Sequence, residues 1–302
     1  MLARTKLLLI GFGTFGQAIA NALSSRSDLS ISVCTRSPRS FPSYITRSFT
    51  DAMDVPMDDF DIVVLALPSF AVGQALSALY ADKRPQGVIV SCAKGLDPHA
   101  TQFVSQVIQS TTGSDAIAVL AGASFAHEMM EDSPVFLTLA CTNPAIGKEL
   151  IDRLETAKLH LELATDVRGM EVVGVAKNIL AVGAGIADGL NLGENFRATY
   201  IARGVAELSR IITMLGGDSD TISKIGALSD IILTCSSDRS RNYRLGRNIA
   251  VNRLHNASLA EGLHSAGAFV NLLERQGAQS RFFSVISEAM GNPSLIVSTL
   301  FR

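Results

Sequence analysis

A glycine-rich stretch near the N-terminus constrains the fold of this chain more than any other feature. An apolar run over Leu7–Ile10 leads into the stretch 11–16, GFGTFG, and small and apolar residues follow. This is the pattern G-x-G-x-x-G between a strand and a helix. The first glycine permits a tight turn, the second lets the backbone approach a pyrophosphate, and the third lets helix and strand pack closely.

The N-terminus of the following helix presents free N–H groups, which suit phosphate oxygens. The alternative is a glycine turn that binds no ligand. We interpret the stretch as a dinucleotide-binding loop, whose predicted cofactor-binding residues are Gly11, Gly13, Thr14, Phe15 and Gly16.

Apolar and helical patterns alternate through the first half of the chain. Strand patterns rich in valine and isoleucine fall at 6–10, 29–35, 61–67, 87–92, 116–121, 135–141 and 159–163. Helical patterns fall at 14–25, 70–81 and 100–109. Near-continuous apolar strands between helices predict a parallel sheet that is covered on both faces. The predicted fold class is therefore α/β, with a Rossmann-like, doubly wound, mainly parallel sheet.

The pattern changes near Asp166. From there on the segments are long and helical, at 170–190, 197–215 and 258–276, with apolar residues at helical spacing. The sequence thus predicts two domains, a dinucleotide-binding domain over residues 1–165 and an all-α, substrate-binding domain over residues 166–302.

Composition limits the partners. Of the 302 residues 47% are hydrophobic and 18% charged, and the formal net charge is −2. Such a chain lacks the excess of positive charge that would attract nucleic acid or an anionic membrane. The apolar run at the start is short and interrupted by glycines, and no stretch approaches the roughly 20 apolar residues of a membrane span. We expect a cytoplasmic protein with no membrane insertion and no nucleic-acid partner.

A metal site is not expected. The four cysteines form no CxxC pair, and the five histidines form no cluster with metal-ligand spacing. We expect the cysteines to be small buried thiols in a protein of a reducing compartment. His127 reads as a polar helix residue rather than a catalytic base.

The second strand pattern ends in Cys34-Thr35-Arg36-Ser37-Pro38-Arg39. A site selective for NAD places Asp or Glu here to bind the ribose 2′-hydroxyl, and this stretch has neither. Arg36 and Arg39 suit a 2′-phosphate, and the Arg36 guanidinium suits stacking on adenine. The alternative is a pair of solvated arginines. We expect NADP(H) to be favoured over NAD(H), or both to be accepted.

Four further motifs follow in order: AKG at 93–95, G-x-SFA-x-E at 122–128, AKN at 176–178 and SRN at 240–242. Together with the glycine loop they resemble the NAD(P)-dependent glycerol-3-phosphate dehydrogenases, of bacterial type, over most of the chain. The sequence departs from the family pattern at Ala123, where proline is usual, and at Ala227–Asp230, where a glycine-rich approach is usual. The segment between Pro38 and Asp61 and the tail after Glu261 are also short.

Lys177 lies in the apolar stretch VVGVAKNILAVGAG, where a lysine is costly unless it faces a cleft or a partner. Desolvation lowers a lysine pKa toward the range that suits proton transfer. The alternative is a lysine that extends to the surface.

The resemblance implies that Lys177 is the general acid and base. It also implies that Asp230 contacts the substrate or Lys177; the alternative for Asp230 is a helix N-cap. Lys94 follows a strand end, where ligands bind in open α/β sheets. Its ammonium group suits polarisation of a substrate carbonyl or binding of the substrate and cofactor.

The SRN motif combines a guanidinium fork with two neutral hydrogen-bonding side chains, which suits a phosphate dianion. The predicted substrate-binding residues are Lys94, Gly122, Ser124, Lys177, Asp230, Ser240, Arg241 and Asn242. The resemblance adds cofactor contacts at Lys94, Ala126, Arg241 and Glu261. The catalytic set that it implies is Lys177, Lys94 and Asp230.

The function that the resemblance implies is reversible NAD(P)H-dependent reduction of dihydroxyacetone phosphate to sn-glycerol 3-phosphate, supplying glycerophospholipid synthesis, by a homodimer. Two alternatives remain open. One is a related reductase for another 2-oxo or 2-hydroxy substrate, as in ketopantoate reductases. The other is a paralogue that senses NADPH without turnover, against which the presence of Lys94, Lys177, Asp230 and Arg241 together argues.

Overall fold

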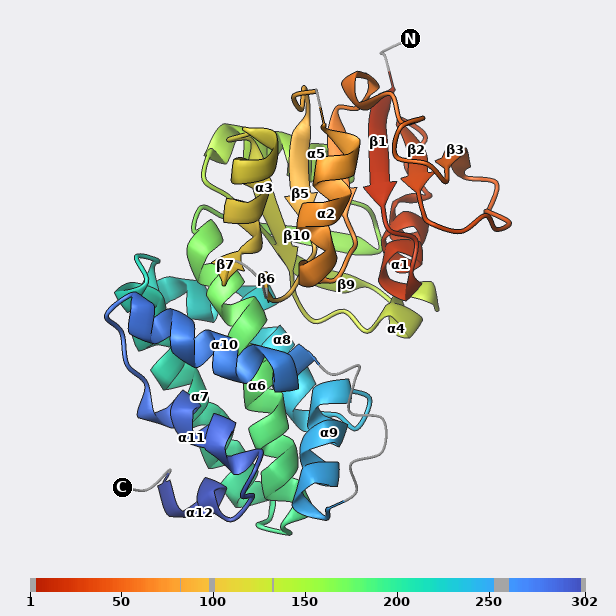
Figure 1. Ribbon diagram of the computed structural model, residues 1–302. Coiled ribbons are helices and arrows are strands. Elements are labelled where there is room, and N and C mark those ends of the chain that lie inside the picture. The colour runs from red at the N-terminus through yellow and green to blue at the C-terminus, as the bar shows by residue number, and fades with distance from the viewer. Residues whose placement is uncertain (1–3, 82, 98–100, 132, 253–260, 300–302) are drawn as a thin grey trace. The chain divides into compact units, whose positions relative to one another are not determined.

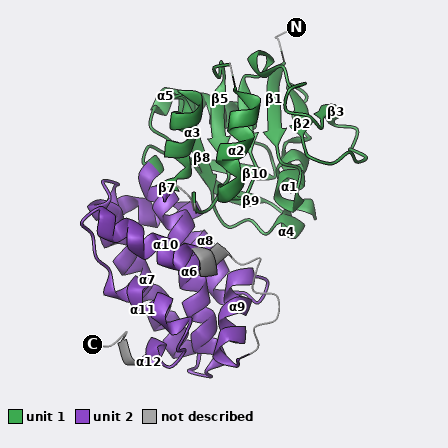
Figure 2. Cartoon of the chain, viewed as in Figure 1, with its two compact units in different colours: residues 1–97, 102–167 green, residues 98–101, 168–302 purple. Residues whose placement is uncertain are grey.

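The computed structural model describes residues 4–81, 83–97, 101–131, 133–252 and 261–299 (Figure 1). The chain divides into two compact units (Figure 2). Unit 1 comprises residues 1–97 and 102–167, and unit 2 comprises residues 98–101 and 168–302. Each unit has its own architecture and is described by itself. The domain boundary at residue 165 stays a prediction, and the two units separate after Val167.

Unit 1 is built on one eight-stranded sheet, in the order β10-β9-β8-β5-β4-β1-β2-β3. The strands are β1 (Thr5–Ile10), β2 (Leu29–Cys34), β3 (Ile45–Phe49), β4 (Ile62–Leu65), β5 (Val88–Ser91), β8 (Ile117–Ala121), β9 (Val135–Cys141) and β10 (Leu159–Ala164). All neighbours pair in parallel except β8 and β9, which are antiparallel. The mainly parallel sheet is therefore confirmed, and β9 and β10 run opposite to the other strands.

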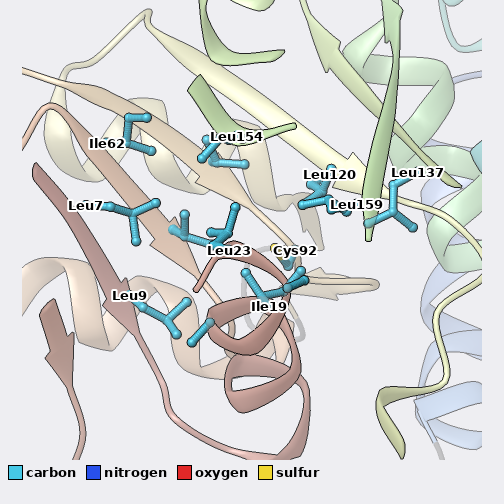
Figure 3. Close-up of a cluster of buried hydrophobic side chains, with 14 of the residues drawn as sticks. Leu7, Leu9, Ile19, Leu23, Ile62, Cys92, Leu120, Leu137, Leu154 and Leu159 are labelled. Atoms are coloured by element: carbon cyan, nitrogen blue, oxygen red, sulfur yellow. The ribbon is translucent and has the colours of Figure 1, made fainter. Parts of the chain in front are cut away.

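Both faces of the sheet are covered, as the near-continuous apolar strands predict. In β1, Leu7 and Leu9 belong to one buried cluster, whereas Leu8 and Ile10 belong to another. The first cluster includes residues of α1 (Thr14–Leu23) and α5 (Pro144–Leu154) and is shown in Figure 3. The second includes residues of α2 (Ser69–Leu79) and α3 (Val104–Thr112). This sandwich of helices about a sheet is the doubly wound arrangement.

Several elements differ from the sequence prediction. The edge strand β3 was not predicted, because its ITRSF sequence is short and three of its residues are exposed. The helix expected at 100–109 begins only at Val104, since β6 (Leu96–Asp97) and β7 (Gln102–Phe103) pair as an antiparallel ribbon before it. Residue 100 lies outside the described residues. The short α4 (Ala126–Met130) and the 3-10 helix η1 (Met57–Asp59) complete unit 1.

Unit 2 is helical throughout its described part after residue 168, as predicted. Its helices are α6 (Val167–Gly189), α7 (Glu194–Met214), α8 (Ile225–Ser236), α9 (Arg241–Ala250), α10 (Glu261–Arg275), α11 (Arg281–Ala289) and α12 (Leu295–Thr299), with a 3-10 helix η2 (Ser219–Ser223). Residues 169–187 of α6 are all buried. This helix is long and apolar enough to cross a membrane, but its most apolar window is 100% buried within the fold, as in the core helix of a soluble protein.

Helices α6 and α9 touch backbone to backbone. A Cβ placed on Gly185 of α6 would collide with the carbonyl oxygen of Tyr243 in α9. A Cβ placed on Gly246 of α9 would collide with the carbonyl oxygen of Val182 in α6. Glycine at both positions therefore sets how closely the two helices approach. This spacing matters for the site, because each helix carries residues of the motifs described above.

Replacement of Gly246 by alanine is expected to destabilise the protein, because the obstructing atom is a backbone carbonyl that cannot move aside. We expect Gly246→Ala to lower the free energy of unfolding by about 1–3 kcal/mol. The matched control is Gly267→Ala in α10, where an added Cβ meets nothing within 4 Å. That change is expected to raise stability by up to about 1 kcal/mol, from helix propensity alone. Urea unfolding of both variants measures the difference, and equal effects would contradict the close helix contact.

Candidate active site

The glycine loop joins β1 to α1 and has the geometry that its pattern predicts. Gly11 has a φ of +91°, and a Cβ there would lie 2.6 Å from the carbonyl oxygen of Ala66. A Cβ on Gly16 would collide with the carbonyl oxygen of Gly11, so the helix packs directly on the turn. A Cβ on Gly13 would meet nothing within 4 Å. Gly13 is therefore not required by the packing of the protein itself, and a ligand that approaches the backbone explains it.

The start of α1 fits the phosphates of a dinucleotide. Gly13 is the N-cap residue and is exposed, as is Thr14, and no side chain caps the helix. Unpaired N–H groups at a helix N-terminus attract anions. The loop geometry thus fits the pyrophosphate of a dinucleotide, and the binding roles of Gly11, Gly13, Thr14, Phe15 and Gly16 stay predictions.

The two arginines after β2 have different positions. Arg36 is exposed, two residues beyond the end of the strand. Arg39 donates a hydrogen bond from Nη1 to the carbonyl oxygen of Phe12, at 2.9 Å. Arg39 is therefore attached to the glycine loop, and the role of Arg36 at a 2′-phosphate stays a prediction.

A second group of predicted residues meets at the same edge of the sheet, because β1, β2, β5 and β8 are parallel. Lys94 follows β5, and its Nζ donates to the carbonyl oxygen of Gly122, after β8, at 3.1 Å. The hydroxyl of Ser124 donates to the same oxygen at 2.9 Å. A Cβ on Gly122 would lie 2.6 Å from Cδ2 of Leu137. Three of the predicted substrate-binding residues are thus in direct contact.

Lys177 and Asp230 form a buried ion pair in unit 2. Lys177 lies in α6 and Asp230 in α8, with only 8% and 6% of their side chains exposed, and Nζ is 3.0 Å from Oδ1. Thr234, one turn after Asp230, accepts a hydrogen bond from Nζ at 3.1 Å and donates to Oδ1 at 3.2 Å. The surface alternative for Lys177 is wrong. So is the N-cap alternative for Asp230, since the N-cap of α8 is Lys224.

The SRN motif begins α9. The hydroxyl of Ser240 caps the helix by accepting from the backbone N–H of Tyr243, at 3.3 Å. The amide of Asn242 donates to the Oδ1 of Asn178 at 2.9 Å. Arg241 is exposed, whereas Ser240 and Asn242 are buried. Asn178 directly follows Lys177, so this amide pair connects the AKN motif to the SRN motif.

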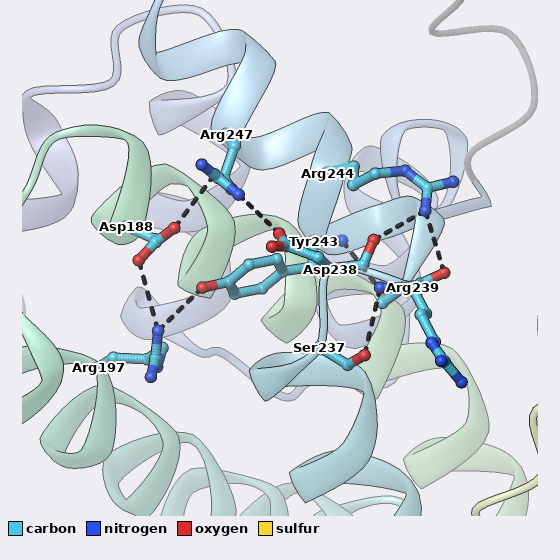
Figure 4. Close-up of polar contacts among 9 residues, drawn as sticks. Asp188, Arg197, Ser237, Asp238, Arg239, Tyr243, Arg244 and Arg247 are labelled. Atoms are coloured by element: carbon cyan, nitrogen blue, oxygen red, sulfur yellow. Dashed lines mark hydrogen bonds and ion pairs between the residues drawn. The ribbon is translucent and has the colours of Figure 1, made fainter.

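The turn that precedes Arg241 is held by a chain of charges, shown in Figure 4. Arg244 donates to the carbonyl oxygen of Asp238 at 2.7 Å, and Arg247 donates to the Asp238 carboxylate at 2.6 Å. Arg247 also pairs with Asp188, which pairs in turn with Arg197. Networks of this kind order exposed turns more effectively than isolated surface pairs do.

Two buried thiols lie beside the lysines and stay neutral. Burial raises the pKa of the Cys92 thiol to about 12, against the opposing effect of Lys94. Burial also raises the pKa of Cys235 to about 12, although the ammonium of Lys177 lowers it. Neither thiol is therefore available as a thiolate nucleophile at neutral pH. Cys141 is also buried, Cys34 is half-buried, and all four cysteines are unpaired.

Three further residues considered from the sequence are Ala126, His127 and Glu261. Ala126 is the first residue of α4 in the GASFAHE stretch, at the same edge of the sheet as Gly122. His127 is exposed and lies 3.7 Å from the Glu128 carboxylate. Glu261 begins α10, but its side chain lies outside the described residues. Among the residues that the structure describes, no group of three His, Cys, Asp or Glu side chains is arranged for a metal ion.

Comparison with known proteins decides the family. A model described as the C-terminus of NAD-dependent glycerol-3-phosphate dehydrogenase matches residues 166–293, and a model of the N-terminus of the same enzyme matches residues 40–147. A protein of Paracoccus denitrificans named glycerol-3-phosphate dehydrogenase (NAD(P)+) is 34% identical over 291 residues, covering 92% of this chain and 91% of that protein. The chain belongs to the NAD-dependent glycerol-3-phosphate dehydrogenase family.

Other relatives agree with this assignment. A Maricaulis maris protein of the same name is 34% identical and covers 78% of this chain and 72% of its own. The solved structure of a glycerol-3-phosphate dehydrogenase from Coxiella burnetii covers 99% of both chains with a TM-score of 0.86, at 24% identity. That likeness concerns the fold, and it confirms the predicted fold class. The resemblance inferred from the AKG, GxSFAxE, AKN and SRN motifs is also confirmed.

In this member of the glycerol-3-phosphate dehydrogenase family, sequence reasoning missed the contacts of Thr234 and Asn178 in unit 2 and that of Arg39 in unit 1. Thr234 lies four residues after Asp230, a spacing that places both side chains on one face of a helix and was a usable signal. Asn178 had a signal in its position beside Lys177. Arg39 was noticed, but its bond to a backbone carbonyl 27 residues earlier had no sequence signature.

Removal of one partner from the Lys177–Asp230 pair is expected to destabilise the protein strongly, because the buried charge that remains loses the opposite charge 3.0 Å away. We expect Lys177→Met and Asp230→Asn each to cost about 3–5 kcal/mol of stability. The double variant is expected to cost clearly less than the sum, because neither charge then remains. Urea unfolding of the four proteins of this cycle tests the coupling, and additive costs would show that the two charges do not interact.

Proposed function

We propose that this chain catalyses the NAD(P)H-dependent reduction of dihydroxyacetone phosphate to sn-glycerol 3-phosphate, and the reverse oxidation. The observation that carries the proposal is the buried Lys177–Asp230–Thr234 set of a chain that belongs to this dehydrogenase family. A buried lysine next to a carboxylate is a costly arrangement, and proton transfer in a reaction explains its retention. The product is a precursor for glycerophospholipid synthesis.

The reduction needs a hydride at the carbonyl carbon and a proton at the carbonyl oxygen. The nicotinamide cofactor, when bound, supplies the hydride. Lys177 gives a proton from its ammonium group to the oxygen as negative charge develops there, and it takes the hydroxyl proton in the oxidation. Asp230 and Thr234 hold the amine in place in both directions. The neutral amine that remains after reduction regains its proton from solvent.

Two further groups bind the substrate in this proposal. Arg241 binds the phosphate dianion through its guanidinium fork, with Ser240 and Asn242 fixing the start of α9 beneath it. Lys94, held against the Gly122 carbonyl beside Ser124, places a second positive charge near the substrate and cofactor. Arg36 favours NADP(H) over NAD(H), because the end of β2 offers a cation and no carboxylate.

The family models and relatives do not favour the alternative substrates or the cofactor-sensing role. A cytoplasmic homodimer remains part of the proposal. The resemblance supports it. The buried position of α6, the one helix in the described part of the chain with the length and hydropathy of a membrane span, argues only against membrane insertion. Sedimentation of the purified protein measures the oligomeric state.

Loss of Lys177 is expected to slow turnover severely. In an assay of NADPH oxidation with dihydroxyacetone phosphate, we expect Lys177→Met to lower kcat by about 100-fold to 10,000-fold, the usual contribution of a general acid. The control is Lys148→Met, an exposed lysine of α5, which is expected to leave kcat unchanged. If Lys177→Met folds poorly, Lys177→Met/Asp230→Asn provides a neutral site for the same assay. Turnover of the parent with ketopantoate, and not with dihydroxyacetone phosphate, would overturn the proposed substrate.

Loss of Arg241 is expected to weaken recognition of the substrate phosphate. We expect Arg241→Gln to raise the KM for dihydroxyacetone phosphate by about 10-fold to 100-fold, since charged hydrogen bonds contribute roughly 1.5–3 kcal/mol. Any turnover of unphosphorylated dihydroxyacetone by the parent is expected to be the same in the variant. Arg239→Gln, an exposed arginine two residues earlier, is the matched control. Equal losses with both substrates would assign Arg241 a role other than phosphate binding.

A further inference from the structure

The loop after β2 is attached to the glycine loop by three contacts. Nη1 of Arg39 donates to the carbonyl oxygen of Phe12 at 2.9 Å, and its Cζ lies 5.9 Å from the centroid of the Phe12 ring. The ring of Phe41 packs against that of Phe12 with centroids 5.4 Å apart. Phe12 is itself buried, with 3% of its surface exposed. Arg39 is therefore in direct contact with Phe12, the middle residue of the G-x-G turn.

A second side chain binds the same carbonyl. Nε2 of Gln17, in the first turns of α1, donates to the oxygen of Phe12 at 3.2 Å. The peptide bond between Phe12 and Gly13 is planar and trans, so its carbonyl and the N–H of Gly13 point in opposite directions. Two donors that fix the carbonyl therefore also fix the direction of the Gly13 N–H group.

Gly13 is the residue at which a cofactor pyrophosphate comes close to the backbone in this pattern. It is exposed, and an added Cβ there would meet nothing within 4 Å. A hydrogen bond from a guanidinium to the Phe12 carbonyl polarises the peptide and strengthens its N–H as a donor. Both arginine side chains are exposed, and it is Arg39 that hydrogen-bonds to the glycine loop.

We infer that Arg39 is a positioning residue for the dinucleotide pyrophosphate, acting through the Phe12–Gly13 peptide, and that it does not read the 2′-phosphate. The pyrophosphate is common to NADH and NADPH, so Arg39 contributes equally to both. Discrimination between the two cofactors is then left to Arg36. This inference rests on the dinucleotide binding contained in the proposed function, and it does not depend on the identity of the substrate.

The test is equilibrium binding of NADPH and of NADH, followed by nicotinamide fluorescence in the absence of substrate. We expect Arg39→Met, which keeps an apolar stem but has no donor, to weaken both cofactors by the same factor, about 5-fold to 50-fold for a charged hydrogen bond. The NADPH-to-NADH affinity ratio is expected to remain as in the parent. Arg39→Lys, which keeps a cationic donor, is expected to recover part of the loss. Arg36→Met is the contrasting variant, expected to weaken NADPH more than NADH and so to change the affinity ratio.

A selective loss of NADPH in Arg39→Met would overturn the inference, as would unchanged affinity for both cofactors. Thermal melting of each variant without cofactor separates a loss of folding from a loss of binding. If Arg39→Met does not fold, Gln17→Met removes the second donor to the same carbonyl. We expect it to weaken both cofactors equally, and unchanged affinity in it would contradict a role for the peptide orientation. A parent protein that binds both cofactors but does not reduce dihydroxyacetone phosphate would refute the proposed reaction and leave this inference intact.

Discussion

The arrangement of unit 2 depends on a charge buried in an apolar helix. Lys177 lies within residues 169–187 of α6, all of which are buried. An ammonium group there is stable only with a carboxylate and further polar partners beside it. Asp230 and Thr234 supply these from α8. The contact of α8 with α6 at this point therefore includes the partners that the lysine needs. The Cys235 thiol nearby stays neutral because burial raises its pKa, against the opposing effect of the Lys177 ammonium.

The sequence predicted most of unit 1, because its signals are local. The spacing of Gly11, Gly13 and Gly16 required a turn, an open backbone and a close helix contact, and each is found at the expected glycine. The apolar strand runs were also readable, since both faces of the sheet are covered. The direction of β9 was not readable, because an apolar run has the same pattern whether it pairs parallel or antiparallel with its neighbour. The strand β3 was missed because it is a short, exposed edge.

The candidate site was predictable in its residue types and less so in its contacts. Motifs identified Lys94, Gly122 and Ser124, but their meeting at one carbonyl oxygen depends on two parallel strands that are 25 residues or more apart in sequence. Both arginines after β2 suited a 2′-phosphate in sequence, and Arg36 alone was also expected to stack on adenine. The structure separates them, because only Arg39 reaches the Phe12 carbonyl. Long-range contacts of this kind arise from chain topology, which the spacing of nearby residues in the sequence does not reveal.

The contact between α6 and α9 has a consequence for how this sequence can change over time. At an ordinary pair of contacting core residues, substitution by a larger side chain at one position can be compensated by a smaller side chain at the other. At Gly185 and Gly246 the opposing atoms are the carbonyl oxygens of Tyr243 and Val182, and a carbonyl oxygen has no smaller substitute. Each glycine is therefore fixed on its own, with no partner mutation that could rescue its loss. Among relatives, we expect these positions to show little variation and no covariation.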